Sequence, residues 1–441
     1  MFTISVKKIA ENQLVRTILG PLFLMTVTPS IVILVFMINR DYGGSILTFI
    51  QNCRTQGFFH LLFSTWAPLF FGSKTAWLMI GLFSLFQITL MKLLPGKRFE
   101  GPITPKGNIP IYKANGVLAF CVSLISFIVG SVGLKLFSPS IIYDNFGPLL
   151  GALNVFSLLF CLALYLKGKY IPSSTDSGTN GNLIFDYYWG TELYPRVWGI
   201  DIKMFTNCRF GMMSWSIICL SFLFKQYELG TLSDSMMVSC FLQIIYCAKF
   251  FVWETGYLRS LDIMHDRAGY YICWGCLVWV PGIYTSCAQY LVLKPIHLGL
   301  PLAITIFCLG VLAIFINYAA DKQRQFVRAT NGNCLVFGKK PKIISVNYLT
   351  EQNERKETLL LASGFWGIAR HFHYVPEILA AFFWALPALA TGFLAYFYVI
   401  FLTLLLLDRA QRDDKRCAKK YQKGWDEYCK LVPYKILPKI Y

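Results

Sequence analysis

The sequence predicts an all-α, polytopic membrane protein with about ten transmembrane helices. Hydrophobic residues make up 56% of the 441 residues and charged residues 15%, whereas a soluble chain carries about 25% charged residues. Apolar stretches close to the roughly 20 residues that cross a bilayer recur along the chain. Lysine and arginine gather in alternate loops between these stretches. Together the three observations exclude an ordinary soluble domain.

The last two apolar stretches abut, and Pro387 and Gly392 interrupt them, which favours a tight hairpin over one long helix. The apolar stretch 58–71 is shorter than a span and favours an interfacial or re-entrant helix. The predicted spans, in chain order, are 17–38, 75–94, 116–137, 146–167, 209–226, 234–253, 271–293, 299–318, 375–391 and 392–407.

The placement of basic residues predicts that both termini lie in the cytoplasm. Most basic residues then fall in the N-terminal arm, in the cytoplasmic loops near 95–115, 167–209 and 320–374, and in the C-terminal tail. The net charge of +18 is therefore a topology signal, and we expect no nucleic-acid partner because no soluble module collects the charge. The first span is long and follows Lys7 and Lys8, so we expect it to be retained rather than cleaved.

The 14 cysteines are scattered mostly through apolar spans, where a free thiol acts as a small hydrophobe. Cys273 and Cys276 form one C-x-x-C pair without further ligands nearby in the sequence, so we expect no metal. Phosphate-binding glycine loops and H-E-x-x-H motifs are missing from the sequence. The lack of an obvious internal repeat disfavours a transporter built from two halves.

Polar groups at membrane depth are functional candidates, and a first cluster occupies residues 182–196. Asp186 and Glu192 stand there among several aromatic residues. Such a segment suits an amphipathic belt at the membrane surface. It equally suits the wall of a pocket that holds an apolar ligand with one polar end, and the residues alone leave both interpretations open.

A second cluster contains Glu254, Asp262, His265 and Asp266. On a continuous helix Glu254, Leu258, Asp262 and His265 would share one face, because they are spaced by four, four and three residues. The stripe is either a buried ion-pair network or a proton source, and we favour the proton source.

A third cluster lies in the last third of the chain, where Arg324 and Arg328 would share a helix face and could grip a phosphate together. Aromatic residues around Trp366 and the basic tail after Asp413 follow. Cations beside flat rings favour a nucleotide cofactor. The alternative is a surface for anionic lipid headgroups.

These residues resemble the sterol reductase family, which includes the lamin B receptor and the Δ14- and Δ7-sterol reductases. The resemblance rests on the segments 182–196, 363–377 and 412–421, the last containing Arg412-Asp413 and Cys417 with Lys420-Tyr421. Phe185 departs from the family's usual Tyr, and residues 422–425 depart from its usual pattern after Tyr421. The resemblance implies NADPH as cofactor, a sterol as substrate, and an endoplasmic reticulum or bacterial inner membrane.

Arg370-His371-Phe372 is similar to the Δ7 branch, whereas Δ14 enzymes usually have Pro after the histidine. The segment 265–281 also resembles the plant-type Δ7 enzyme. The resemblance therefore implies reduction of the C7–C8 double bond. A Δ14-sterol reductase, a catalytically silent sterol-binding protein of the same fold, and a lipid or solute transporter are the alternatives.

The resemblance also implies residue roles within one integrated membrane domain, with four spans in residues 1–208 and six in residues 209–441. Because an isolated alkene is not polarised, an acid must protonate it before hydride arrives. Candidates for that proton relay are Asp266, His265, Tyr284 and Glu254. Candidates for the sterol pocket are Asp186, Glu192 and Trp274. The implied cofactor residues are Arg324, Arg328, Leu361, Trp366, His373, Tyr374, Asp413, Cys417, Lys420, Tyr421 and Tyr428. Other sterol-biosynthesis enzymes are expected partners.

Overall fold

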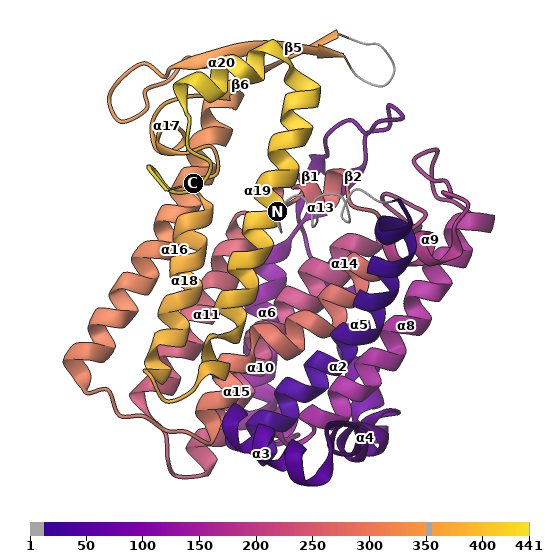
Figure 1. Ribbon diagram of the computed structural model, residues 1–441, viewed down its shortest axis with the longest axis vertical. Coiled ribbons are helices and arrows are strands. Elements are labelled where there is room, and N and C mark those ends of the chain that lie inside the picture. The colour runs from indigo at the N-terminus through magenta and orange to yellow at the C-terminus, as the bar shows by residue number, and fades with distance from the viewer. Residues whose placement is uncertain (1–12, 350–354, 441) are drawn as a thin grey trace.

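The structure, a computed structural model, describes residues 13–349 and 355–440 (Figure 1). The N-terminal arm with Lys7 and Lys8 lies outside this part. Within it, nine helices are long and apolar enough to cross a membrane. A shorter apolar helix at Tyr374–Ala388 lies where the sequence predicts the span 375–391. The nine are Val15–Asp41, Lys74–Leu93, Gly116–Gly133, Phe146–Tyr170, Met204–Glu228, Asp234–Val252, Tyr270–Val292, Leu300–Ala329 and Phe393–Tyr421.

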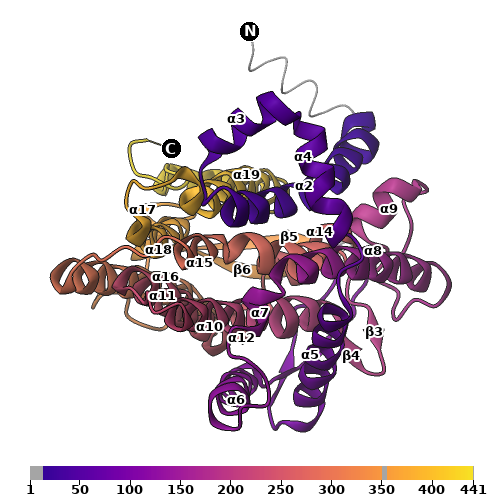
Figure 2. The same ribbon diagram turned by 90° about the horizontal axis from the view of Figure 1, so that it is seen from below.

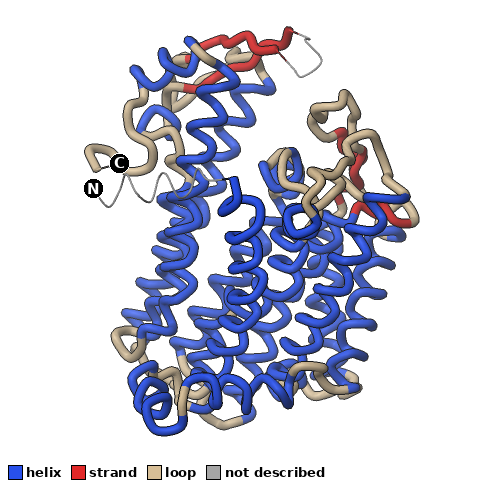
Figure 3. Tube along the Cα trace, turned by 45° about the vertical axis from the view of Figure 1, so that its right-hand side comes forward, coloured by secondary structure: helices blue, strands red, loops and turns tan. Residues whose placement is uncertain are grey.

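The non-membrane segments gather at the two ends of the bundle, as the sequence predicted. One end carries all the strands of the described residues, in three antiparallel two-stranded hairpins (Figure 3). These are β1–β2 (Lys97–Glu100, Ile111–Ala114), β3–β4 (Arg196–Val197, Ile200–Asp201) and β5–β6 (Ile343–Leu349, Arg355–Leu361). The other end carries α3 (Ile46–Gln56) and α4 (Phe58–Leu69) (Figure 1). The described N-terminal helix begins at the end where the C-terminal tail lies.

The first four crossings are α2 (Gly20–Asp41), α5 (Lys74–Leu93), α6 (Gly116–Ile128) and α8 (Phe146–Tyr170). Helix α4 packs against α8 because Gly151 lacks a side chain. A Cβ atom there would lie 1.7 Å from the Leu69 carbonyl oxygen, so no other residue fits this contact. The short helix predicted near 58–71 is confirmed, and Figure 2 shows α5 and α6 on the side of the bundle away from α19.

The remaining crossings form the better buried half, in which two spans contain π-helical turns. One of these, η4, includes Pro281, whose missing N–H interrupts regular α-helical hydrogen bonding. The elements are η3 (Met204–Gly211) with α10 (Met212–Glu228), α11 (Asp234–Val252), α14 (Tyr270–Trp274) with η4 (Gly275–Tyr284) and α15 (Ser286–Val292), α16 (Leu300–Ala329), α18 (Tyr374–Ala385) and α19 (Phe397–Tyr421).

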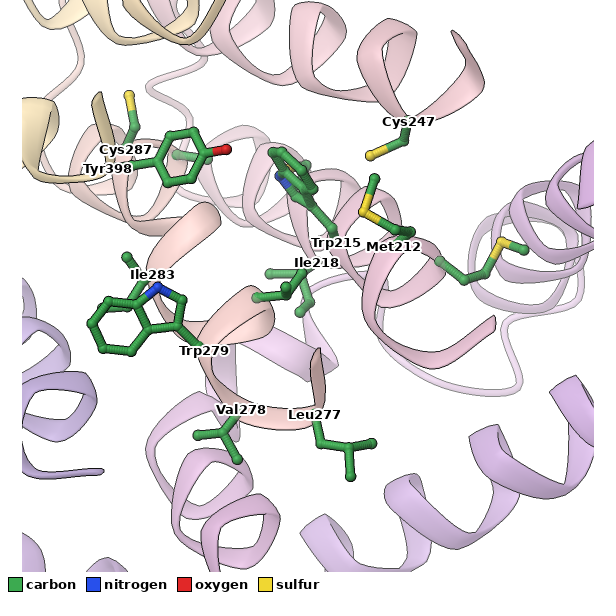
Figure 4. Packing of buried hydrophobic residues seen from close by; sticks show 14 of the residues in the cluster. Met212, Trp215, Ile218, Cys247, Leu277, Val278, Trp279, Ile283, Cys287 and Tyr398 are labelled. Carbon is green, nitrogen blue, oxygen red and sulfur yellow. The ribbon is translucent and has the colours of Figure 1, made fainter. Parts of the chain in front are cut away.

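The core of this half is aromatic, and its rings lie edge to face or stacked. Trp215 and Tyr398 are both buried, with ring centroids 6.1 Å apart (Figure 4). Cys247 and Cys287 fill the space beside them as buried free thiols. Within residues 13–349 and 355–440 no three His, Cys, Asp or Glu residues gather to hold a metal ion.

The hairpin predicted from Pro387 and Gly392 is confirmed. Helix α18 ends in the 3-10 turn η5 (Leu386–Ala388), and η6 (Phe393–Tyr396) leads into α19. The Tyr290 hydroxyl donates to Thr391 Oγ1 at 3.0 Å. A Cβ atom at Gly392 would lie 2.5 Å from that hydroxyl, so the turn needs glycine for this close approach.

Candidate functional site

The C-terminal segments form a lobe at one end of the bundle, above α16, α18 and α19 (Figure 1). The lobe, called here the tail lobe, consists of the last turns of α16 and α19, the β5–β6 hairpin, α17 (Phe365–Ile368) and α20 (Lys423–Leu431). All eleven residues that the resemblance assigned to the cofactor lie on this lobe or on the first turn of α18 beneath it. Their contact with a cofactor stays a prediction, but their convergence is a finding.

Four of the eleven build the interior of the tail lobe. Leu361 and Trp366 are buried in one small apolar cluster, and Cys417 and Tyr428 are buried in another. Trp366 Nε1 donates to the Ala320 carbonyl at 2.7 Å, which fixes the indole on α16. These side chains therefore hold the lobe's shape.

Cations lie over the aromatic rings of the tail lobe. The Arg324 guanidinium carbon is 4.0 Å from the centre of the Trp366 ring. The Lys420 ammonium is 4.0 Å from the centre of the Tyr348 ring. Arg328 is exposed and donates through Nε to the Leu359 carbonyl at 3.3 Å, which leaves its terminal nitrogens for an anion. This arrangement can bind phosphate groups beside a flat ring.

The carboxylates near these cations are paired within the lobe. Asp413 accepts from Arg416 at 2.6 Å. Asp414 lies 3.4 Å from Arg370, and Arg370 also donates to the Val432 carbonyl at 2.9 Å. Arg370 therefore ties the C-terminal tail to the segment that precedes α18. Arg416 donates to Asp413 Oδ1 through both Nε and Nη2, so this pairing leaves Asp413 Oδ2 available to a ligand.

A buried histidine, His371, and a half-buried one, His373, lie between the tail lobe and α18. The His371 ring stacks on Tyr374, with centroids 5.2 Å apart and planes 9° apart, and the His373 ring is 4.9 Å from Trp366. Burial lowers the pKa of His371 to about 4 and lowers that of His373 well below its ordinary value. His371 Nε2 and His373 Nδ1 are buried without a hydrogen-bond partner among the described residues. Neutral imidazoles with unused nitrogens suit an uncharged, amide-bearing ligand ring.

A chain of polar and aromatic contacts leads from these histidines into the bundle. Asn317 Nδ2 donates to the His373 carbonyl at 2.9 Å, and Lys249 donates to Asn317. One helical turn away the Tyr246 hydroxyl donates to Glu377. None of these four residues was predicted from the sequence, although each is a polar group in or beside an apolar span, which marks a functional candidate.

The inner end of this chain is the aromatic core. The Tyr246 ring lies 5.5 Å from Trp215, and Trp215 lies 5.1 Å from Tyr284. Tyr284 in turn lies 4.4 Å from Tyr398. Tyr284, a predicted member of the proton relay, is thus joined by ring contacts through Trp215 to the Tyr246–Glu377 pair.

The prediction of a continuous helix over residues 254–265 is wrong. The segment forms two short helices, α12 (Glu254–Tyr257) and α13 (Leu261–Met264), with a break between them. Glu254 is 3% exposed and pairs with the fully buried Arg209 at 2.5 Å. It also accepts from the Gly116 backbone at 2.9 Å. Glu254 therefore joins α12 to η3 and α6, which favours the ion-pair interpretation for this residue.

The rest of the acidic segment stays together. Asp266 is buried and lies 3.0 Å from His265 Nδ1, whose side chain is 58% exposed. Asp262 pairs with Arg409 of α19 at 2.7 Å. Lys203 is buried beneath the segment and donates to the Asp266 carbonyl at 2.7 Å, and burial lowers the pKa of Lys203 to about 8. A buried carboxyl beside an exposed imidazole is an arrangement that can relay a proton from water.

The three residues assigned to the sterol pocket have partners within the protein. Asp186 accepts from the Asn180 backbone at 2.8 Å. Glu192 pairs with Lys167 at 2.8 Å, and Trp274 Nε1 donates to Asn154 at 3.0 Å. These contacts favour structural roles for the polar atoms, and contact with a sterol stays a prediction.

Comparison with known proteins assigns the class. Residues 17–441 match the family model described as the ergosterol biosynthesis ERG4/ERG24 family, and the chain belongs to this sterol reductase family. It is a multi-pass membrane protein, as its helices and its relatives indicate.

The individual relatives include both 7-dehydrocholesterol reductases and Delta(14)-sterol reductases. The chain is 52% identical to the 7-dehydrocholesterol reductase of Arabidopsis thaliana, over 95% of this chain and 96% of the relative. It is 37% identical to the 7-dehydrocholesterol reductase of Xenopus laevis, over 80% of this chain and 76% of the relative. It is also 34% identical to the Delta(14)-sterol reductase of Methylotuvimicrobium alcaliphilum, over 95% of this chain and 94% of the relative.

Proposed function

We propose that the protein reduces the C7–C8 double bond of a sterol with NADPH. One observation carries the choice of bond: the 52% identity to a 7-dehydrocholesterol reductase, against 34% to a Delta(14)-sterol reductase over the same share of the chain. Phe372, which follows Arg370-His371 as in the Δ7 branch, supports the same choice.

The tail lobe fits NADPH as its cofactor. Arg324 and Arg328 offer guanidinium groups for its phosphates, and the unpartnered nitrogens of His371 and His373 can bond its nicotinamide amide. Bound there, NADPH would supply a hydride to the sterol. The acid Asp321, 3.3 Å from Arg324, keeps that guanidinium oriented before a phosphate arrives.

The chain's own contribution is the proton. A ring alkene that is not conjugated with a carbonyl must be protonated before it can accept a hydride, because nothing polarises it. The carbocation that results must be kept from water, which the apolar core around Trp215 can do. The faces of aromatic rings such as Tyr284 can also stabilise the positive charge.

Two pairs of groups can deliver that proton. One is Asp266 with His265, since His265 is exposed to water and Asp266 is buried. The other is Tyr246 with Glu377, which hydrogen bond inside the bundle. The second pair lies on the chain of contacts that begins at His373, on the tail lobe's side of the core. We propose that the Tyr246–Glu377 pair protonates the sterol and that Asp266–His265 exchanges protons with water.

A Δ14-sterol reductase is the second candidate, because the bacterial relative of that name aligns with 95% of this chain. A paired-substrate assay separates the two. Purified protein is incubated with NADPH and equal amounts of 7-dehydrocholesterol and a Δ8,14-diene sterol, and the sterols are profiled. We expect loss of the Δ7 bond alone. Reduction of the Δ14 bond alone would assign the other activity, and no reduction of either would leave a silent sterol-binding protein.

A further inference from the structure

A cavity of about 300 Å³ lies where β2, the β3–β4 hairpin, the end of α5 and the start of η3 meet. These elements belong neither to the tail lobe nor to the acidic segment. Tyr112 and Asp201 form part of its wall, and each is 4% exposed. Since one water occupies about 30 Å³ in the liquid, the cavity has room for a group much larger than a single water.

The wall contains two buried polar atoms without a hydrogen-bond partner among the described residues: the Tyr112 hydroxyl and Asp201 Oδ2. Asp201 Oδ1 is occupied, since it accepts from the Met204 backbone at 2.9 Å. Burial raises the pKa of Asp201, and burial together with Asp201 raises that of Tyr112. A ligand that donates a hydrogen bond would satisfy both atoms.

The same cavity is rich in cations. Lys92, Lys113 and Arg196 line it, against the single carboxylate of Asp201. Lys113 donates to the Lys92 carbonyl at 2.8 Å, and Arg196 donates to the Ile111 carbonyl, so both are held in place at the wall. An occupant that carries a net negative charge and also a hydrogen-bond donor therefore suits the cavity.

The cavity stands at the level where two membrane spans end. The span Lys74–Leu93 finishes beside it and the span Met204–Glu228 begins in its wall. Leu93, which follows the lining residue Lys92, is 76% exposed, so an apolar side chain is available to lipid next to the cavity. Trp198, also on the wall, is 86% exposed and has a φ of 50°, a conformation that costs energy for a bulky residue. An exposed indole at this level is typical of a membrane–water interface.

We propose that this cavity binds the headgroup of an anionic glycerophospholipid that carries hydroxyl donors. Its phosphate would lie between Lys92 and Arg196, and a headgroup hydroxyl would donate to Asp201 and meet Tyr112. Its acyl chains would lie outside the protein, past Leu93. Phosphatidylinositol has this chemistry, whereas phosphatidylcholine has a phosphate but no donor in its headgroup.

The test measures how much phosphatidylinositol raises the unfolding temperature of the full chain in detergent, since a ligand that binds the native state stabilises it. We expect a rise with phosphatidylinositol, and little or none with phosphatidylcholine or with the soluble headgroup glycerophosphoinositol. Tyr112→Phe should unfold no earlier than wild type without lipid, because its hydroxyl has no partner, yet bind the lipid about five- to tenfold more weakly. Lys92→Glu should also weaken binding, and its control is Lys169→Glu, an exposed residue at the same end of the bundle.

Three other outcomes would contradict the proposed lipid site. Equal effects of phosphatidylinositol and phosphatidylcholine would overturn the proposal and leave ordered water as the occupant. A rise with glycerophosphoinositol as large as with the lipid would assign the cavity to a soluble phosphate compound instead. Unchanged lipid affinity in both Tyr112→Phe and Lys92→Glu would place the lipid elsewhere.

Discussion

The Arg324 guanidinium carbon lies 4.0 Å from the centre of the Trp366 ring. Trp366 is 3% exposed and is fixed through its indole nitrogen to the α16 backbone. The ring is therefore a rigid platform that holds the cation flat at the surface of the tail lobe. A prearranged cation loses little side-chain freedom when an anion binds, which is why we assign Arg324 and Arg328 to the phosphates of NADPH.

Replacing Arg328 by Ala should raise the Michaelis constant for NADPH about tenfold or more. A charge-assisted hydrogen bond contributes roughly 1.5–3 kcal/mol, and Arg328 has terminal nitrogens free for a phosphate. Steady-state assays at saturating sterol give the constant. The control is Lys340→Ala, which removes an exposed cation from the loop that follows α16. This variant should leave the Michaelis constant for NADPH unchanged. An unchanged constant in Arg328→Ala would move the phosphate site elsewhere.

Replacing Glu254 by Gln should lower stability without removing activity. Its 2.5 Å pair with Arg209 is buried, and removing one partner of such a pair costs about 3–5 kcal/mol. The unfolding temperature should fall clearly, while turnover at low temperature is kept. Glu100→Gln is the matched control, since its 3.9 Å pair with Arg98 is exposed and contributes little. A stable Glu254→Gln protein without turnover would restore Glu254 to the proton relay.

Tyr246→Phe should lower the turnover number at least a hundredfold and leave NADPH binding intact. General acid catalysis contributes about 10²–10⁴-fold to a reaction rate. We propose that the Tyr246 hydroxyl donates its proton to the alkene. Asp266→Asn and His265→Ala should lower turnover less, because water can replace part of a relay. Binding of NADPH is measured separately by fluorescence quenching. Wild-type turnover in Tyr246→Phe with loss in Asp266→Asn would reverse the two roles.

Stability should fall as the pH drops from about 6.5 to 4. Burial lowers the pKa of His371 from 6.5 to about 4, so in this window the unfolded chain binds a proton that the folded chain does not. For one such group the loss by pH 4 is roughly 3 kcal/mol. Unfolding temperatures across this range should fall less in His371→Gln than in wild type. His297→Gln, at an exposed site, should follow wild type; three identical profiles would contradict the assignment.

The membrane-spanning helices could be predicted from the sequence because length and hydropathy report them directly. The hairpin at Pro387 and Gly392 could be predicted for the same reason, since proline and glycine act locally. The sequence could predict that the cations and aromatic rings of the tail lobe form one cluster, but it could not predict how the lobe is folded. Its residues are far apart along the chain, and no periodicity brings the β5–β6 hairpin over α16.

The prediction of an acidic stripe was wrong because a spacing of four, four and three residues places side chains on one face only of an unbroken helix. Gly256 breaks that assumption: a Cβ atom there would lie 2.0 Å from the Trp253 ring, so the chain folds back on that ring. The Tyr246–Glu377 pair was missed for a different reason. Each residue stands alone among apolar neighbours, and only the packing of α11 against α18 brings the two together.

We propose that the C7–C8 bond receives a proton from the protein and a hydride from NADPH. The most direct test runs the reaction with 7-dehydrocholesterol in deuterated water, and again in ordinary water with NADPH deuterated at the transferred position, then locates deuterium in the product. We predict one solvent deuterium at one former alkene carbon and one cofactor deuterium at the other. This mechanism would be contradicted if both added hydrogens came from the same source, or if the product were reduced at another bond.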